Sequence, residues 1–196
     1  LPEINEAATT LDANIKAIPN PTFKYQNDTF QNASHYSLVT KAIPSALYFI
    51  FDGYQPISML EFQKKIVTLD SGYTDYLVQK YDNLNTRLGL QMKPRLSDFK
   101  AIEAAIMKNK AYGEFQTLAN YANKNYPKTT LGTFHQAMYY EKTGNYKKAI
   151  KEYQKSFSQE AIRELTKDFM LSRSEALRDK PDSPIELPAE VPAEAP

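Results

Sequence analysis

The sequence of 196 residues has no cysteine, only two histidines and no long apolar run. Without cysteine there is no disulfide bond, no thiolate zinc site and no cysteine nucleophile. Two histidines disfavour a metal site built from several imidazoles, so we expect neither a metal nor a bound cofactor. No stretch reaches the roughly 18 consecutive apolar residues that a membrane-spanning helix needs. The sequence therefore predicts no membrane span.

An excess of charge of one sign is also missing. The 24 basic and 23 acidic residues leave a net charge of +1. A chain without a strong positive field has little attraction for nucleic acid or anionic lipid, so we expect no nucleic-acid partner. What is present, with 42% hydrophobic and 24% charged residues, is the composition of an ordinary globular protein with room for one domain or two small ones.

The amino-terminal segment predicts a helix followed by a strand. Residues 1–17 are mostly helical in pattern, and prolines at positions 19 and 21 break the helix. Phe23 and Tyr25 then alternate with polar neighbours, which predicts a short strand over residues 23–30.

A polar loop and a second helix are predicted next. Residues 31–37 are polar and contain His35, whereas residues 40–51 carry apolar side chains at helical spacing. Pro44 is expected in or near the first turn of this helix, where a missing N–H costs least. After Pro56 the whole chain has a helical pattern, and Gly89 is expected to end one of these helices in a left-handed conformation.

Residues 95–178 contain an internal repeat. When the sequence is shifted by about 34 residues, Lys110 aligns with Gly144 and Phe115 aligns with Ala149. This shift is the helix–turn–helix period of tetratricopeptide repeats, so the region predicts repeats of that type, closed by a further helix over residues 161–177. Such repeats present a surface to a protein partner or to a second copy of the chain. The Pro/Glu-rich residues 179–196 predict a disordered tail.

The segment from Asn32 to Tyr54, with His35 before Ser-Leu-Val and a helix ending in Phe-Ile-Phe-Asp-Gly, resembles the end of the hydrolase domain in bacterial esterases. These are the α/β-hydrolases related to esterase D and the enterochelin esterases, and several members continue into tetratricopeptide repeats. The resemblance implies a mainly α chain: a C-terminal remnant of an α/β-hydrolase domain (1–56, with the last strand, the histidine loop and a helix), connecting helices (57–94) and helical hairpins (95–178). It also implies that His35 is the general base of a catalytic triad.

No nucleophile accompanies that histidine. A Gly-x-Ser-x-Gly elbow, which carries the serine in this family, is absent from the sequence. We therefore expect a chain that is inactive alone and belongs to a longer serine esterase with a small-molecule ester as substrate. Asp28 and Asp52 are poor candidates for the triad acid, because in the family that residue comes from an earlier strand. His135 falls inside a repeat helix and is expected to be structural or exposed.

Two functions thus remain open: part of a carboxylic-ester hydrolase, or a non-enzymatic interaction module made of helical repeats. A single strand between two helices is an incomplete layer, so residues 1–56 are expected to pair with another chain or to be mobile. The sequence starts at Leu1 and has no cysteine, which favours an exported or periplasmic protein only weakly.

Overall fold

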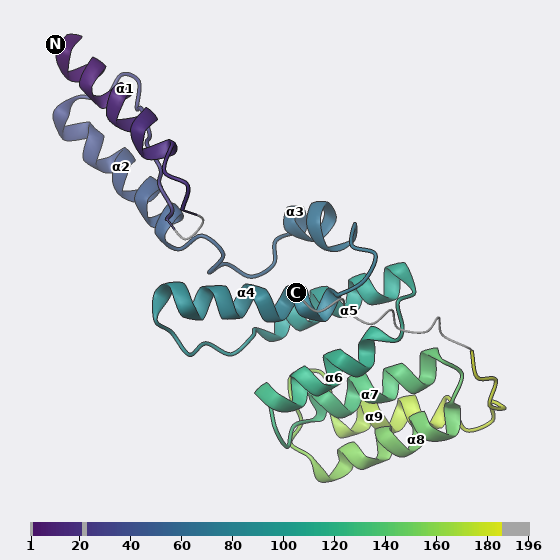
Figure 1. Cartoon of the computed structure of the whole chain (residues 1–196). Coiled ribbons are helices and arrows are strands. Elements are labelled where there is room, and N and C mark those ends of the chain that lie inside the picture. Colours follow the sequence, from purple (N-terminus) through teal and green to yellow (C-terminus); the bar gives the residue numbers. More distant parts are fainter. Residues whose placement is uncertain (1, 21–22, 186–196) are drawn as a thin grey trace. The chain divides into compact units, whose positions relative to one another are not determined.

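A computed structural model describes residues 2–20 and 23–185, which form two compact units, Leu1–Tyr54 and Gln55–Pro196, called unit 1 and unit 2 below. Within this described part of the chain the secondary structure is almost entirely helical, and Figure 1 shows the order of the helices. The expectation of a mainly α protein is confirmed. None of the helices among the described residues is both long and apolar enough to cross a membrane.

Unit 1 contains two helices, α1 (Pro2–Lys16) and α2 (His35–Ile50). The predicted strand over residues 23–30 is wrong, since these residues are irregular and the described part of the chain has only isolated bridges. A strand is held by hydrogen bonds to a neighbouring strand, and no other described segment of unit 1 offers such an edge. The alternation of Phe23 and Tyr25 therefore has no ladder to join.

The loop predicted over residues 31–37 is shorter in the structure, because α2 already begins at His35. Ser34 caps this helix: its Oγ accepts a hydrogen bond from Ser37 N at 3.1 Å, and Ser34 N donates to Ser37 Oγ at 2.8 Å. This reciprocal pair stabilises an early helix start. Since α2 begins earlier than predicted, Pro44 lies in the helix interior instead of the first turn.

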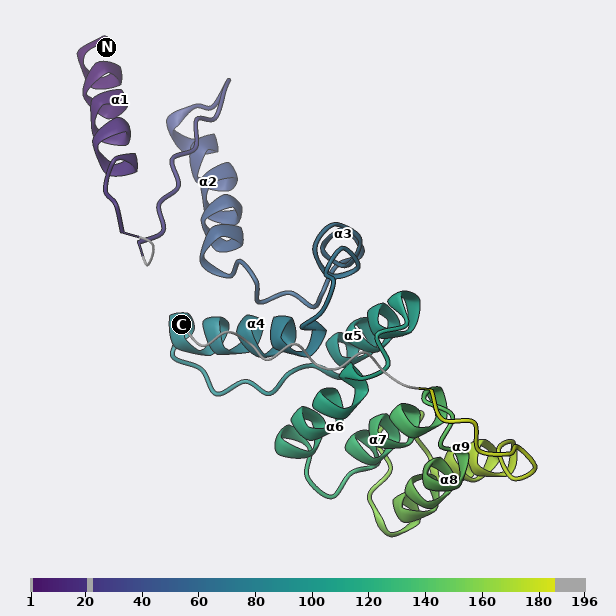
Figure 2. The ribbon, with the colours of Figure 1, turned by 45° about the vertical axis from the view of Figure 1, so that its right-hand side comes forward.

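The described residues of unit 1 form no buried core. Over residues 4–20 and 23–54 no side chain reaches the buried class, and α2 contains no buried residue although it is the more apolar of the two helices. Helices α1 and α2 run alongside each other in Figure 1, but the turned view of Figure 2 separates them. Their apolar faces are therefore not covered by each other.

Unit 2 begins with a short helix α3 (Met59–Glu61), which continues into one π-helical turn (Phe62–Ile66), and then forms α4 (Tyr73–Leu88). Gly89 adopts the expected left-handed conformation after α4, with φ of 62°. Asp98, fully buried at the start of the next helix, accepts hydrogen bonds from Ile57 N at 3.0 Å and from Tyr81 Oη at 2.9 Å. It thereby ties the first segment of unit 2 to α4.

Two helical hairpins follow. The first pairs α5 (Leu96–Asn109) with α6 (Glu114–Asn125), and the second pairs α7 (Thr130–Lys142) with α8 (Tyr146–Lys155). The starts of α5 and α7 are separated by the same shift that aligns the two repeats in the sequence. Lys110 and Gly144, the aligned turn residues, both have left-handed φ values, 57° and 76°. The two hairpins are thus built to the same period.

The helices α6, α7 and α8 lie side by side in both ribbon views, and α9 (Lys167–Glu175) packs against α8 (Figures 1 and 2). Arg173 of α9 donates from Nη2 to both carboxylate oxygens of Glu141, at 2.5 and 2.6 Å, and Tyr153 Oη donates to the same carboxylate at 2.8 Å. This cluster joins α7, α8 and α9. The closing helix predicted over residues 161–177 is present but shorter.

The first residues of the predicted tail have a defined place on unit 2. Ser183 N donates to the carbonyl oxygen of Gly144 at 2.9 Å, and Ile185 N donates to that of Thr143 at 3.0 Å. A side chain at position 144 would overlap the carbonyl oxygen of Ser183, so the glycine permits this close approach as well as the turn. Residues 186–196, the rest of the predicted tail, lie outside the described residues.

Candidate functional site

His35, the residue predicted to be the catalytic base, is the first residue of α2 and is exposed. Its ring contacts that of Tyr36 edge-on, with the ring centres 5.8 Å apart. The capping hydrogen bonds between Ser34 and Ser37 fix the backbone on either side of it. The imidazole therefore projects from the amino-terminal end of an apolar helix.

Neither aspartate considered from the sequence is placed as a partner for this ring. Asp28 accepts hydrogen bonds from Ser45 Oγ and from Gln26 Nε2, and these bonds, the one from Ser45 first, lower the pKa of its carboxyl group. Asp52 forms an ion pair with Lys24 at 3.4 Å and follows the far end of α2, about 24 Å of helix away from His35. Neither of these two aspartates therefore pairs with His35 among the described interactions of unit 1.

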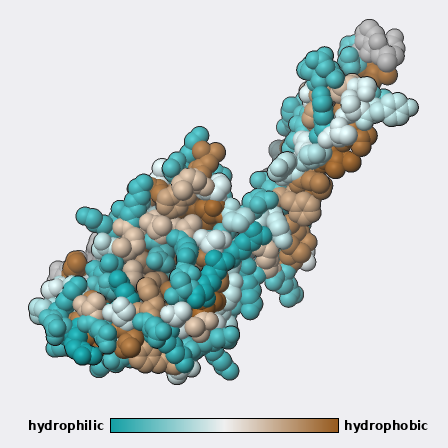
Figure 3. Space-filling model, turned by 180° about the vertical axis from the view of Figure 1, so that it is seen from behind, coloured by the Kyte–Doolittle hydropathy of each residue, from teal (hydrophilic) through white to brown (hydrophobic). Residues whose placement is uncertain are grey.

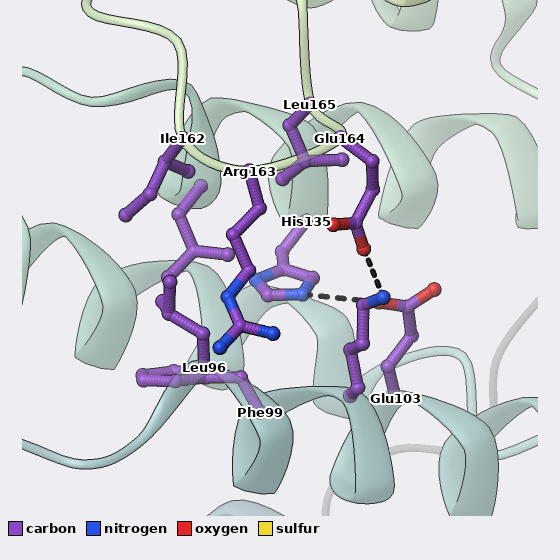
Figure 4. A pocket seen from close by; sticks show the side chains of 10 residues that line it. Leu96, Phe99, Glu103, His135, Ile162, Arg163, Glu164 and Leu165 are labelled. Carbon is purple, nitrogen blue, oxygen red and sulfur yellow. Dashed lines mark ion pairs between the residues drawn. The ribbon is translucent and has the colours of Figure 1, made fainter.

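A second candidate site, not predicted from the sequence, lies in unit 2. A small hollow, open to solvent, lies between α5, α7 and the turn before α9 (Figure 4). Apolar side chains form most of its wall and charged ones stand at the mouth. The lining residues are Leu96, Phe99, Lys100 and Glu103 of α5, Leu131 and His135 of α7, and Ile162, Arg163, Glu164 and Leu165 of the turn.

His135 is fully buried in this wall, so of the two alternatives expected from the sequence, structural or exposed, exposure is excluded. Its ring is stacked between those of Phe99 and Phe115, with centres 6.0 and 6.2 Å away. Neither ring nitrogen has a hydrogen-bond partner among the described residues, although Nε2 lies 3.5 Å from Oε2 of Glu103. Buried polar atoms are nearly always paired, so this imidazole calls for an explanation.

The turn over residues 162–165 closes the hollow. A bridge between Ile162 and Leu165 holds its ends together, and Thr130 Oγ1 donates to the carbonyl oxygen of Leu165 at 2.9 Å. Arg163 at its tip has a left-handed φ of 51°, which is uncommon for a residue with a side chain. Lys100 forms an ion pair with Glu164, and this interaction, before all others, lowers the pKa of that carboxyl group.

Sequence reasoning missed this site for an identifiable reason. His135 shares one face of α7 with Leu131 and Met138, at helical spacing on either side of it, and a histidine in such an apolar stripe signals burial. The identity of its neighbours depends on the packing of α5 and on the turn after α8, which no local pattern gives. Among the described residues no cluster of three or more acidic or histidine side chains is arranged to hold a metal ion.

Comparison with known proteins gives one informative likeness. The sequence matches no protein-family model and no curated protein sequence. The structure is similar to the crystal structure of an uncharacterised protein from Capnocytophaga ochracea DSM 7271, with a TM-score of 0.76 and 32% sequence identity over 87% of this chain. The match covers 48% of that protein, so this chain spans about half its length.

Proposed function

We propose that this chain is the C-terminal part of a serine carboxylic-ester hydrolase, in which His35 is the general base and unit 2 is an accessory helical domain. One observation carries the proposal: the described residues of unit 1 include no buried side chain, although α2 is strongly apolar. A segment of this kind gains stability only against another body. The end of an α/β-hydrolase domain is such a segment, because its last helix packs on a sheet built by earlier residues.

The apolar stripe of α2 consists of Val39, Ile43, Leu47 and Ile50, which follow one another at helical spacing. Each of the four is about half exposed, between 48% and 54%. Figure 3 shows apolar side chains gathered along the surface of unit 1. Burying the remaining surface would contribute about 1 kcal/mol for each residue, or about 4 kcal/mol for the stripe. This gain favours packing of the segment on a sheet.

The irregular segment 23–30 fits the same proposal. In a sheet it would find the backbone partners that the described part of unit 1 does not offer, and the alternation of Phe23 and Tyr25 with polar residues would place both rings on one face. His35 would then follow the last strand and stand near the carboxyl edge of the sheet, where nucleophiles of this fold lie. The related crystal structure is about twice as long as this chain, which leaves room for a domain of equal size in a protein of that length.

In the proposed reaction His35 takes the proton of a serine hydroxyl while the serine oxygen attacks the ester carbonyl. The resulting imidazolium donates this proton to the departing alcohol, and an acyl-enzyme remains. His35 then activates a water molecule, which releases the carboxylic acid and restores the serine. Because the sequence has no serine elbow, this chain is expected to show no turnover of esters by itself.

The test compares His35→Ala with Gln31→Ala, a nearby exposed control, in the longest polypeptide that the gene encodes. With a chromogenic short-chain ester, kcat for His35→Ala should fall by about three orders of magnitude or more, whereas Gln31→Ala keeps full activity. A loss of less than threefold in His35→Ala would show that this histidine is not the base. In the same protein Leu47→Glu should lower the melting temperature, while Tyr48→Glu, on the other side of α2, should not.

A second function is favoured by the shared period of the two hairpins, seen in the starts of α5 and α7 and in the turns at Lys110 and Gly144. Helical repeats of this period commonly bind peptides or other subunits. Unit 2 would then be a module for protein–protein interaction or self-association. Sedimentation of residues 55–196 across a wide concentration range, together with affinity capture on this unit, tests this. A monomer that captures no partner would contradict it.

A further inference from the structure

The segment that connects α1 to α2 lies between these two helices, and its side chains point alternately to one and to the other (Figure 2). On one side, Lys24 forms an ion pair at 3.4 Å with Asp52, which follows α2. On the same side, Gln26 Nε2 donates to Ser45 Oγ of α2 at 3.1 Å, and this hydroxyl donates to Asp28. These three side chains of the segment therefore face α2.

The side chains between them face α1. The carboxyl group of Asp12 in α1 has a lowered pKa, caused first by the hydrogen bond from Lys16 and then by interactions with Asn27 and Tyr25. Asn27 and Tyr25 therefore lie beside α1. Side chains that alternate between two opposite faces have the geometry of a β-strand, although residues 23–30 form no ladder with any residue that the structure describes.

The backbone of this strand-like segment is bare along both edges. No backbone–backbone hydrogen bond joins residues 24–30 to another described residue. In a strand the N–H and C=O groups point sideways, between the two faces, and a bare edge of this kind pairs readily with a strand of another chain. In the proposed hydrolase the preceding strands of the sheet would use one edge only. The other edge is then available for a further partner, whether or not His35 is a catalytic base.

The sequence of this segment is complementary to itself in one register. If two copies pair antiparallel about Gln26, Lys24 of each copy stands opposite Asp28 of the other. Phe23 then stands opposite Thr29. Opposite charges, and an aromatic residue beside a β-branched one, are favourable pairs across antiparallel strands. A shift of the register by two residues would remove both charge pairs.

Both charged groups are able to take a second partner. The two hydrogen bonds that Asp28 accepts end on Oδ2, which leaves Oδ1 for a further donor. The side chain of Lys24 is 51% exposed, and its ammonium group has three donors. We propose that two copies of this chain associate through one edge of residues 23–30, antiparallel and centred on Gln26. This contact is symmetric about a twofold axis, so the pair of Lys24 and Asp28 occurs twice in it.

Sedimentation equilibrium of the full chain tests the proposal, and the unaltered chain should dimerise. Lys24→Glu sets two acids opposite each other and Asp28→Lys sets two lysines opposite each other, so each variant alone should associate about tenfold more weakly or worse. An equimolar mixture of the two variants should associate about as tightly as the unaltered chain. The reason is that every charge pair across the mixed dimer again joins opposite signs.

The mixture is also the control for changes inside each copy, since it contains the same two altered polypeptides. Lys151→Glu, which alters an exposed charge in unit 2, should associate like the unaltered chain. A chain that stays monomeric up to about 1 mM would overturn the proposal. So would a mixture that associates no more tightly than the single variants, or equal association of Lys24→Glu and Lys151→Glu, which would assign the contact to another surface. The esterase experiment depends on His35 and is unaffected by any of these results.

Discussion

Replacement of Glu141 by alanine should destabilise unit 2 strongly, because this side chain joins three helices. Its side chain is 11% exposed, and its carboxylate accepts two hydrogen bonds from Arg173 of α9 and one from Tyr153 of α8. Removal of one partner of a buried ion pair costs about 3–5 kcal/mol, since the other charge stays desolvated. The side chain of Arg173 is 35% exposed and can recover some hydration, so we expect about 2–3 kcal/mol.

The assay is thermal unfolding of unit 2 followed by circular dichroism. For a unit of this size each kcal/mol lowers the melting temperature by about 4 °C, so Glu141→Ala should melt about 8–12 °C below the unaltered protein. Glu141→Gln keeps the shape and one acceptor oxygen and should lie between the two.

The matched control is Glu152→Gln, whose carboxylate forms an ion pair with exposed Lys155 at 3.4 Å. Exposed ion pairs contribute little to stability, so Glu152→Gln should lower the free energy of unfolding by less than about 0.5 kcal/mol. If Glu141→Ala and Glu152→Gln cause equal losses, the cluster of Glu141, Tyr153 and Arg173 does not hold α9 in place, and the reasoning is refuted.

Two further predictions concern buried groups of unit 2. Asp98→Ala should lower the free energy of unfolding by about 3 kcal/mol in a urea titration, because Ile57 N and Tyr81 Oη lose their acceptor. A decrease of less than about 0.5 kcal/mol, which is typical of a surface substitution, would contradict this. Alkali should unfold unit 2, because burial raises the pKa of Tyr121 from 10.0 to about 12 and also raises the pKa of other tyrosines, namely Tyr76, Tyr81, Tyr126 and Tyr153. The folded state holds these protons longer than the unfolded state, so stability is full below pH 10 and falls between pH 10 and 12. Phenolate absorbance and helicity should change together in that range, and titration of all tyrosines near pH 10 with helicity intact would be the contrary result.

Local sequence patterns predicted most of the helices. They failed where the structure depends on contacts between residues far apart in the sequence. The helical pattern after Pro56, the helix end at Gly89 and the repeat period are set within short stretches of the chain, so α4 and the two hairpins follow from them. The strand over residues 23–30 failed because a strand needs an edge to pair with, and alternation alone cannot supply one.

The candidate sites show the same division. The error at His35 was local: Ser34 and Ser37 form a capping box, but serine in place of the usual glutamate at its third position hid the helix start. The environment of His135 was beyond reach of any local pattern. Its ring is stacked by one residue of α5 and one of α6, and the turn that closes the hollow follows only after the whole of α8.

Unit 1, as far as the structure describes it, lacks a core, and this has a calorimetric consequence. The enthalpy of unfolding is proportional to the number of residues that are ordered and packed, at about 0.7 kcal/mol per residue near 60 °C. The segment from Gln55 to Ile185 should therefore absorb about 90 kcal/mol, whereas the residues of unit 1, if they were fully packed, would add about 40 kcal/mol. The chain by itself should lack most of this second contribution, which should appear when a covering domain is present.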